Sequence, residues 1–222
     1  MGLKESGLRG SLRNVSVGIR AIPDSDLYYT IDEGEGDIVN DQIGDNNGVS
    51  TGSLVWVEDA SVGHEFYVEL DGTNYIEVQD STIISDNSDF TVGIEIEVGS
   101  EGLDDCNIWN WGNGSRTHAI GASSGNIGSN AFDGSSQRGN PAHPEPEAPY
   151  NINLVYTWDA STETPELYLD ETSSTTTENS GGSTSDGLAI GADTIGSNDM
   201  GGAGVARFAH WDEIVDPSEF TL

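Results

Sequence analysis

Short apolar runs alternate with polar, glycine-rich stretches along most of this chain. Residues 90–98 place apolar side chains at every second position, which predicts a β-strand with one buried and one solvated face. Asp71-Gly72 separates two such runs and is a turn signal typical of a β-hairpin. The expected strands cover residues 27–31, 53–58, 64–70, 75–78, 90–98, 107–111, 118–122, 152–158, 166–170, 188–192 and 205–211. So many short strands predict an all-β fold, a two-sheet antiparallel β-sandwich.

Two stretches do not fit a strand pattern. Residues 125–150 contain a proline-rich run at 141–149, and residues 172–186 are rich in Ser, Thr and Gly. Long loops on a rigid sandwich are common places for binding sites, so Arg138 in the first stretch is a candidate ligand-binding residue. The alternative is that both stretches are inert connections.

The N-terminal segment differs in charge from the rest of the chain. Residues 1–20 hold four basic residues against one acid, a net charge of +3, which leaves −35 for the rest. The pattern predicts two parts, a basic anchoring arm at 1–25 and a sandwich domain at 26–222. A flexible leader without a partner is the alternative for the arm. The expected assembly residues are Leu3, Lys4, Leu8, Arg9, Leu12, Arg13 and Arg20.

Charge is the most unusual property of the composition. The chain has 39 Asp and Glu against 7 Lys and Arg, a net charge of −32. Self-repulsion of this size destabilises a compact state, whereas concentrated salt screens it, so a high-salt environment is expected. The acids are spread among apolar positions, which argues against an acidic disordered tail. Nucleic acid is excluded as an expected partner, and no apolar run reaches the length of a membrane span.

Several motifs occur in an order that resembles a known family. These are the Tyr28-Tyr29-Thr30-Ile31 opening, the 66–78 hairpin, Asp89-Phe90-Thr91-Val92, and the late pairs 153–159 with 166–170 and 188–192 with 208–214. Over residues 27–220 they resemble laminin-G-like, or concanavalin A-like lectin and glucanase, jelly-roll domains. The resemblance implies a jelly roll that binds glycans or proteins, and some members hydrolyse glycans. Residues 2–15 resemble leader arms on structural proteins of tailed viruses that infect halophilic archaea.

One carboxylate pair is a candidate for glycan hydrolysis. Glu95 and Glu97 lie two residues apart on one strand face, and retaining glycosidases need two carboxyl groups about 5–5.5 Å apart. The further acids of the glucanase pattern are replaced by Val98 and Gly99. A solvated strand face is the favoured interpretation, and the chain is predicted not to be an enzyme.

A sugar-binding surface is predicted around two tryptophans. Trp109 and Trp111 are spaced to share one face of a strand, where their rings could stack on a sugar. Aromatic core packing is the alternative. The candidate ligand-binding set is Trp109, Trp111, Asn113, Arg116, His118 and Arg138, with Asn110 beside it.

Calcium is the candidate ion, because hard oxygen ligands abound in the turn-rich stretch before residue 50. The expected ligands are Asp32, Asp41 and Asp45, joined by Asp212 from the closing strand. Ordinary turn chemistry, in which Asp binds its own backbone, is the alternative.

Together these features predict a non-enzymatic structural or adhesive protein on a virion surface, such as a capsid turret, spike or tail fibre. The arm would bind other virion or capsid proteins within a homo-oligomer, and the acidic domain would face outward and bind a host surface glycan or glycoprotein. A cellular, extracellular glycan-binding module or a weak glycoside hydrolase of a halophile is the alternative.

We expect the free energy of unfolding to rise with salt, because the screening length falls from about 10 Å at 0.1 M to about 3 Å at 1 M. Urea denaturation at a series of potassium chloride concentrations measures this. A denaturation midpoint that does not change with salt would contradict the predicted high-salt environment.

Overall fold

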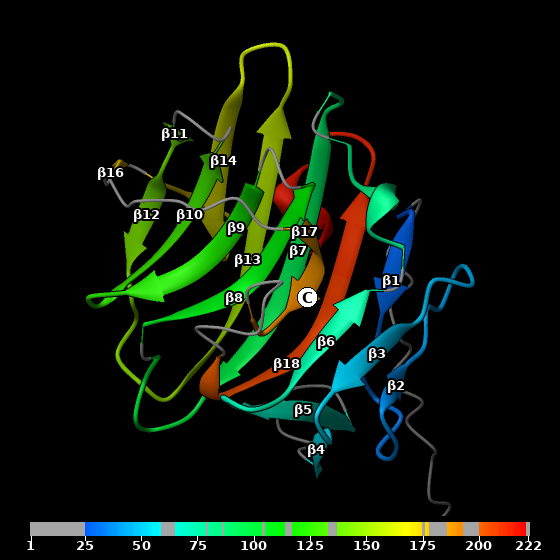
Figure 1. Cartoon of the computed structure of the whole chain (residues 1–222). Helices are drawn as coiled ribbons and strands as arrows, with labels where there is room; N and C mark the ends of the chain where they lie inside the picture. Colours follow the sequence, from blue (N-terminus) through cyan, green and yellow to red (C-terminus); the bar gives the residue numbers. More distant parts are fainter. Residues whose placement is uncertain are drawn as a thin grey trace, which may run out of the picture.

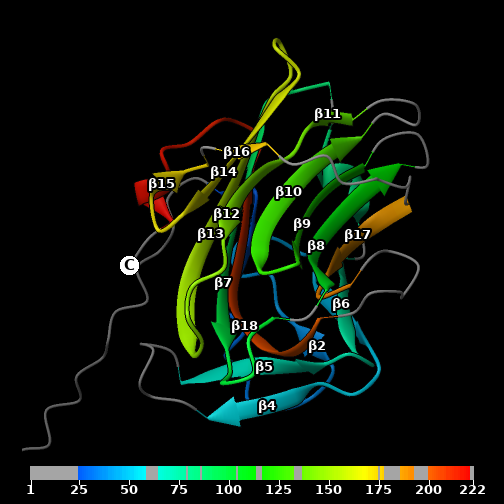
Figure 2. The same ribbon diagram turned by 90° about the vertical axis from the view of Figure 1, so that its left-hand side faces the viewer.

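The computed structural model describes residues 25–58, 65–78, 80–85, 87–103, 105–113, 117–132, 137–174, 176–177, 186–192 and 200–220. Within these residues the chain forms two antiparallel sheets stacked as a sandwich (Figures 1 and 2). The only helices among them are two short 3₁₀ turns, η1 (Ser81–Ile83) and η2 (Pro217–Glu219). The predicted all-β sandwich is therefore confirmed. Residues 1–24 of the expected basic arm lie outside the described part.

The smaller sheet has eight strands in the order β15-β14-β13-β7-β18-β5-β4, with β1 also paired to β18. Their bounds are β1 Leu27–Tyr29, β4 Val55–Glu58, β5 Phe66–Asp71, β7 Phe90–Val98, β13 Tyr150–Asp159, β14 Thr164–Leu169, β15 Thr172–Ser173 and β18 Gly201–Trp211. The longest strands, β7, β13 and β18, lie next to one another at its centre.

The larger sheet has ten strands in the order β16-β12-β10-β9-β8-β17-β6-β3-β2, with β11 also paired to β10. Their bounds are β2 Ile38–Val39, β3 Gly48–Thr51, β6 Tyr75–Val78, β8 Cys106–Asn113, β9 Thr117–Ser123, β10 Asn126–Phe132, β11 Gln137–Gly139, β12 Pro141–Pro144, β16 Thr176–Thr177 and β17 Asp186–Ile190. None of the described residues forms a helix long and apolar enough to span a membrane.

The core lies between the sheets and is formed by alternate residues of each strand. Trp109, Phe90, Tyr156 and Phe208 are each no more than 1% exposed. Burial of a large apolar side chain stabilises the fold by roughly 1.5–3 kcal/mol, so these rings hold the two layers together.

Residues 125–150 form three strands that the sequence pattern did not predict. Strand β10 pairs with β9 along its whole length, although most of its residues are small or polar and few are large and apolar. Strand β12 begins at Pro141 and ends at Pro144, and prolines are tolerated at such positions. The interpretation of this stretch as a long loop was wrong, because pairing with neighbours overrides its weak strand propensity.

The central strand β7 is buried on both faces, whereas its alternating pattern predicted one solvated face. Its outer face is covered by the C-terminal segment, residues 212–220, which lies against the side of the smaller sheet away from the core (Figure 2). The Oγ1 of Thr91 donates to the carbonyl of Glu213 and accepts from the N–H of Val215. A Cβ at Gly93 would lie 2.5 Å from the ring of Phe220, so the segment requires glycine there.

Candidate functional site

The two tryptophans of the predicted sugar-binding surface lie in the core. Trp109 is 0% exposed and Trp111 is 3% exposed, so neither ring is available to stack on a sugar. His118 is also buried, and its Nδ1 lies 2.7 Å from the hydroxyl of Tyr156. The expectation of a stacking platform is corrected in favour of aromatic core packing, because this face of β8 turns toward the other sheet.

Of the other expected ligand-binding residues, the structure describes the side chain of Asn113 alone. Asn113 is exposed at the end of β8. Arg116 lies outside the described residues. The backbone of Arg138 belongs to β11, but its side chain lies outside the description.

The face of β8 opposite the two tryptophans points away from the core, so Asn110 does not lie beside them, contrary to the expectation from the sequence. Because side chains alternate along a strand, Asn110 between the two tryptophans lies on the outer face of the larger sheet. Cross-strand register places Ala119 and Asn130 on one side of it, and Ala189 and Glu77 on the other. These five side chains form one row across the outer face, which we call the amide row.

The amide row combines small side chains with hydrogen-bonding groups. Ala119 and Ala189 are 3% and 1% exposed, and Asn110 is 5% exposed, so the middle of the row is enclosed rather than open to solvent. The Oδ1 of Asn130 is buried and has no hydrogen-bond partner among the described residues. A buried acceptor without a partner is costly, and a ligand hydroxyl at this position would satisfy it.

The expected calcium ligands Asp32, Asp41, Asp45 and Asp212 do not form one group. The carboxylate of Asp41 accepts hydrogen bonds from the backbone N–H groups of Tyr28, Ile43 and Asn46. That of Asp32 accepts from the hydroxyl of Thr30. Asp41 therefore stabilises its own turn, which was the alternative interpretation. Calcium binding itself stays a prediction.

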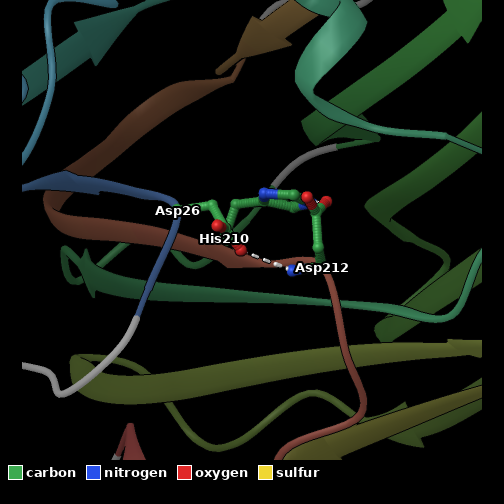
Figure 3. Close-up of side chains that lie close together, drawn as sticks. All are labelled: Asp26, His210 and Asp212. Carbon is green, nitrogen blue, oxygen red and sulfur yellow. Dashed lines mark hydrogen bonds and ion pairs between the residues drawn. The ribbon is translucent and has the colours of Figure 1, made fainter.

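One group of three possible metal ligands exists among the described residues: Asp26, His210 and Asp212. Asp26 precedes β1, His210 lies in β18, and Asp212 follows that strand (Figure 3). One ligand atom from each residue lies within 4.8 Å of the other two. Burial lowers the pKa of His210 to about 4, against an opposing effect of Asp26. The imidazole is therefore neutral at pH 7 and able to bind a metal.

In the carboxylate pair considered for catalysis, Glu95 forms a buried ion pair with an arginine. Glu95 is 1% exposed, and its Oε2 accepts from Nε of Arg207 at 2.6 Å. Arg207 also donates to the Oδ1 of Asn153 and to the carbonyl of Phe220, whose ring lies 4.7 Å from the guanidinium carbon. The expectation that Glu95 lies on a solvated strand face was wrong, because the C-terminal segment covers it.

Sequence reasoning missed Asp26, Asn130 and Arg207, and it set aside His210 because the four histidines have no zinc-type spacing along the chain. Arg207 had a readable signal, since it is one of three basic residues after position 20 and stands inside an apolar strand. An arginine in that setting requires a buried acid. Asn130 had no such signal, because its strand was not recognised.

Comparisons with known proteins add to this geometry. No family model and no curated protein matches the chain. One similar structure is domain 4 of AbnA, a GH43 extracellular arabinanase from Geobacillus stearothermophilus, in complex with arabinotriose. It has a TM-score of 0.62 and 14% identity, and the match covers 89% of this chain and 97% of that one. Botulinum neurotoxin type C, which depends on two ganglioside molecules to enter cells, has a TM-score of 0.62 and 11% identity.

That match covers 89% of this chain and 50% of the neurotoxin chain, so the present chain spans about half of it. The binding domain of Paraclostridial Mosquitocidal Protein 1 has a TM-score of 0.60 and 13% identity, covering 90% of this chain and 51% of that one. This chain shares their β-sandwich fold. At these identities the likeness establishes the fold alone.

We expect Arg207→Met to lower the free energy of unfolding by about 3–5 kcal/mol, because it leaves Glu95 buried without its ion-pair partner. Urea denaturation at constant high salt measures the change. The double variant Glu95→Met with Arg207→Met should lose less than the sum of the two single variants. Glu97→Gln is the control on the same strand face, where partial exposure limits the loss to about 1 kcal/mol. Additive losses would contradict a coupled pair.

Proposed function

We propose that this chain is a non-catalytic recognition module that binds a glycan at the amide row on the outer face of its larger sheet. The single observation that carries the proposal is the Oδ1 of Asn130, which is buried, has no hydrogen-bond partner among the described residues and lies in a row with Asn110 and Glu77. Amide and carboxylate groups are suited to sugar hydroxyls, because they offer both donors and acceptors at fixed positions.

The small side chains of the row support this proposal. Ala119 and Ala189 separate the three polar residues and are buried with Asn110, whereas Asn130 is half-buried and Glu77 exposed, so a glycan would contact the row at these two ends. Gly128 and Gly121 face each other on the same side of the sheet and extend the small-residue surface.

The structural neighbours also support glycan binding. One contains arabinotriose, and another depends on ganglioside molecules to enter cells. Transfer of this property to the present chain is our proposal, since fold alone does not give function.

A non-catalytic role is supported by the state of Glu95. Its carboxylate is neutralised by Arg207 and buried under the C-terminal segment, away from the proposed glycan surface. A carboxylate in this position cannot reach a glycosidic bond, so the pair with Glu97 is not arranged for hydrolysis.

The wider setting that we propose is the outer surface of an assembly in concentrated salt, such as a virion of a halophilic host. The charge asymmetry supports it: +3 over residues 1–20 against −35 over the remainder. The basic segment would bind other virion proteins, and the acidic domain would face outward.

A glycan array probed at about 2 M potassium chloride tests the proposed site. We expect Asn130→Ala to weaken binding by about tenfold or more, since it removes the unpartnered acceptor. Asn126→Ala is the matched control, on the same strand and face but about 13 Å away. A blank array, or equal binding by wild type and Asn130→Ala, would overturn the proposed function. Release of reducing ends that Glu95→Gln abolishes would show a hydrolase instead.

Deletion of residues 1–22 tests the proposed anchoring. We expect the truncated chain to stay folded in high salt but to lose incorporation into its assembly, because the positively charged residues are removed. Circular dichroism and sedimentation measure folding and assembly separately. Unchanged incorporation would eliminate the anchoring role.

A further inference from the structure

We propose that Asp26, His210 and Asp212 form a binding site for a divalent transition-metal ion of the zinc class. The site lies at the rim of the sandwich, where the first strand of the smaller sheet begins and its last strand ends (Figure 3). It is separate from the amide row, which lies on the outer face of the larger sheet.

Strand pairing brings the three residues together. Leu27 in β1 is the register partner of His210 in β18, so Asp26 and Asp212 flank this pair at the strand ends. The N–H of Asp26 donates to the carbonyl of His210, and the N–H of Asp212 donates to Oδ2 of Asp26. These hydrogen bonds hold the three residues next to one another before any ion is bound.

The imidazole of His210 is the observation that points to a ligand. The residue is 0% exposed, and neither ring nitrogen has a hydrogen-bond partner among the described residues. Its Nε2 lies 3.7 Å from Oδ1 of Asp212, which is too far for a hydrogen bond. A buried imidazole with both nitrogens unsatisfied carries a desolvation cost that a metal bond would offset.

The two carboxylates complete the donor set. One carboxylate oxygen of Asp26 and one of Asp212 lie within 4.8 Å of each other, so their negative charges repel. A cation between them removes this repulsion. One neutral nitrogen and two carboxylate oxygens form a set that zinc accepts, with bond lengths of about 2.0–2.2 Å.

The histidine decides between metals. Calcium and magnesium prefer oxygen ligands alone, whereas imidazole suits zinc and its transition-metal neighbours. Ligand atoms at tetrahedral zinc lie roughly 3–4 Å apart, so the present group must close slightly. Asp26 and Asp212 are exposed and can move toward the fixed imidazole. A bound ion would link Asp26, just before β1, to Asp212, just after β18, and so connect two segments that are far apart in the sequence.

The test uses the full chain, stripped with a chelator and titrated with zinc chloride in competition with a chromophoric chelator, in about 2 M potassium chloride. We expect one zinc ion per chain. Asp212→Asn and Asp26→Asn should each weaken binding by about tenfold or more, because each removes an anionic ligand. Asp26→Asn retains an oxygen that accepts the N–H of Asp212, and both side chains are exposed, so both variants should fold.

Asp105→Asn is the matched control, since it removes the same charge from an exposed aspartate outside the group that, like Asp26, accepts a backbone N–H. Its zinc affinity should equal that of the wild type, and calcium should not displace the zinc. Cobalt bound in place of zinc should give visible absorption bands that Asp212→Asn loses. The proposal is overturned if the folded chain binds no zinc, if both ligand variants bind as the wild type does, or if calcium competes equally.

Discussion

Side chains alternate between the two faces of every strand, and this constraint decides what each position of the sandwich can do. In β8 the bulky Trp109 and Trp111 take the inner face, where they pack against the opposite sheet. Asn110 between them must then face outward. The same two tryptophans cannot both form a sugar-binding platform and pack in the core. Core packing prevails, because burial of two indole rings stabilises the fold and their exposure to water does not.

The same constraint explains the ion pair on the smaller sheet. In β7 the residues at 90, 92, 94, 96 and 98 point into the core, so Glu95 must lie on the other face. That face is covered by the C-terminal segment, and an acid there needs a cation. Arg207 of the neighbouring β18 supplies it and also binds the carbonyl of Phe220. One side chain thus neutralises a buried charge and fastens the segment that buries it.

The rim group follows from strand pairing rather than from alternation alone. His210 shares the inner face with Leu27, and its ring lies 6.2 Å from that of Phe90. The imidazole is buried because the core surrounds it, while the acids at the strand ends remain exposed. A chain with an excess of acids offers many carboxylates on its surface. The proximity of two of them to a buried neutral nitrogen distinguishes this place from the rest of the described surface.

Hydrophobic periodicity and composition alone established the fold class, most of the described strands and the large negative charge. The period-two pattern of residues 90–98 identified the strand and its core-facing side chains, but it did not show that the other face is covered as well. The sequence did not reveal β10, whose small and polar residues carry little strand signal. Tertiary structure alone decided which face of β8 is buried, which acid pairs with Arg207, and which histidine lies beside two carboxylates. The physical reason is that these outcomes depend on contacts between residues as far apart as Asp26 and Asp212, and a local pattern contains no information on what a distant strand places opposite it.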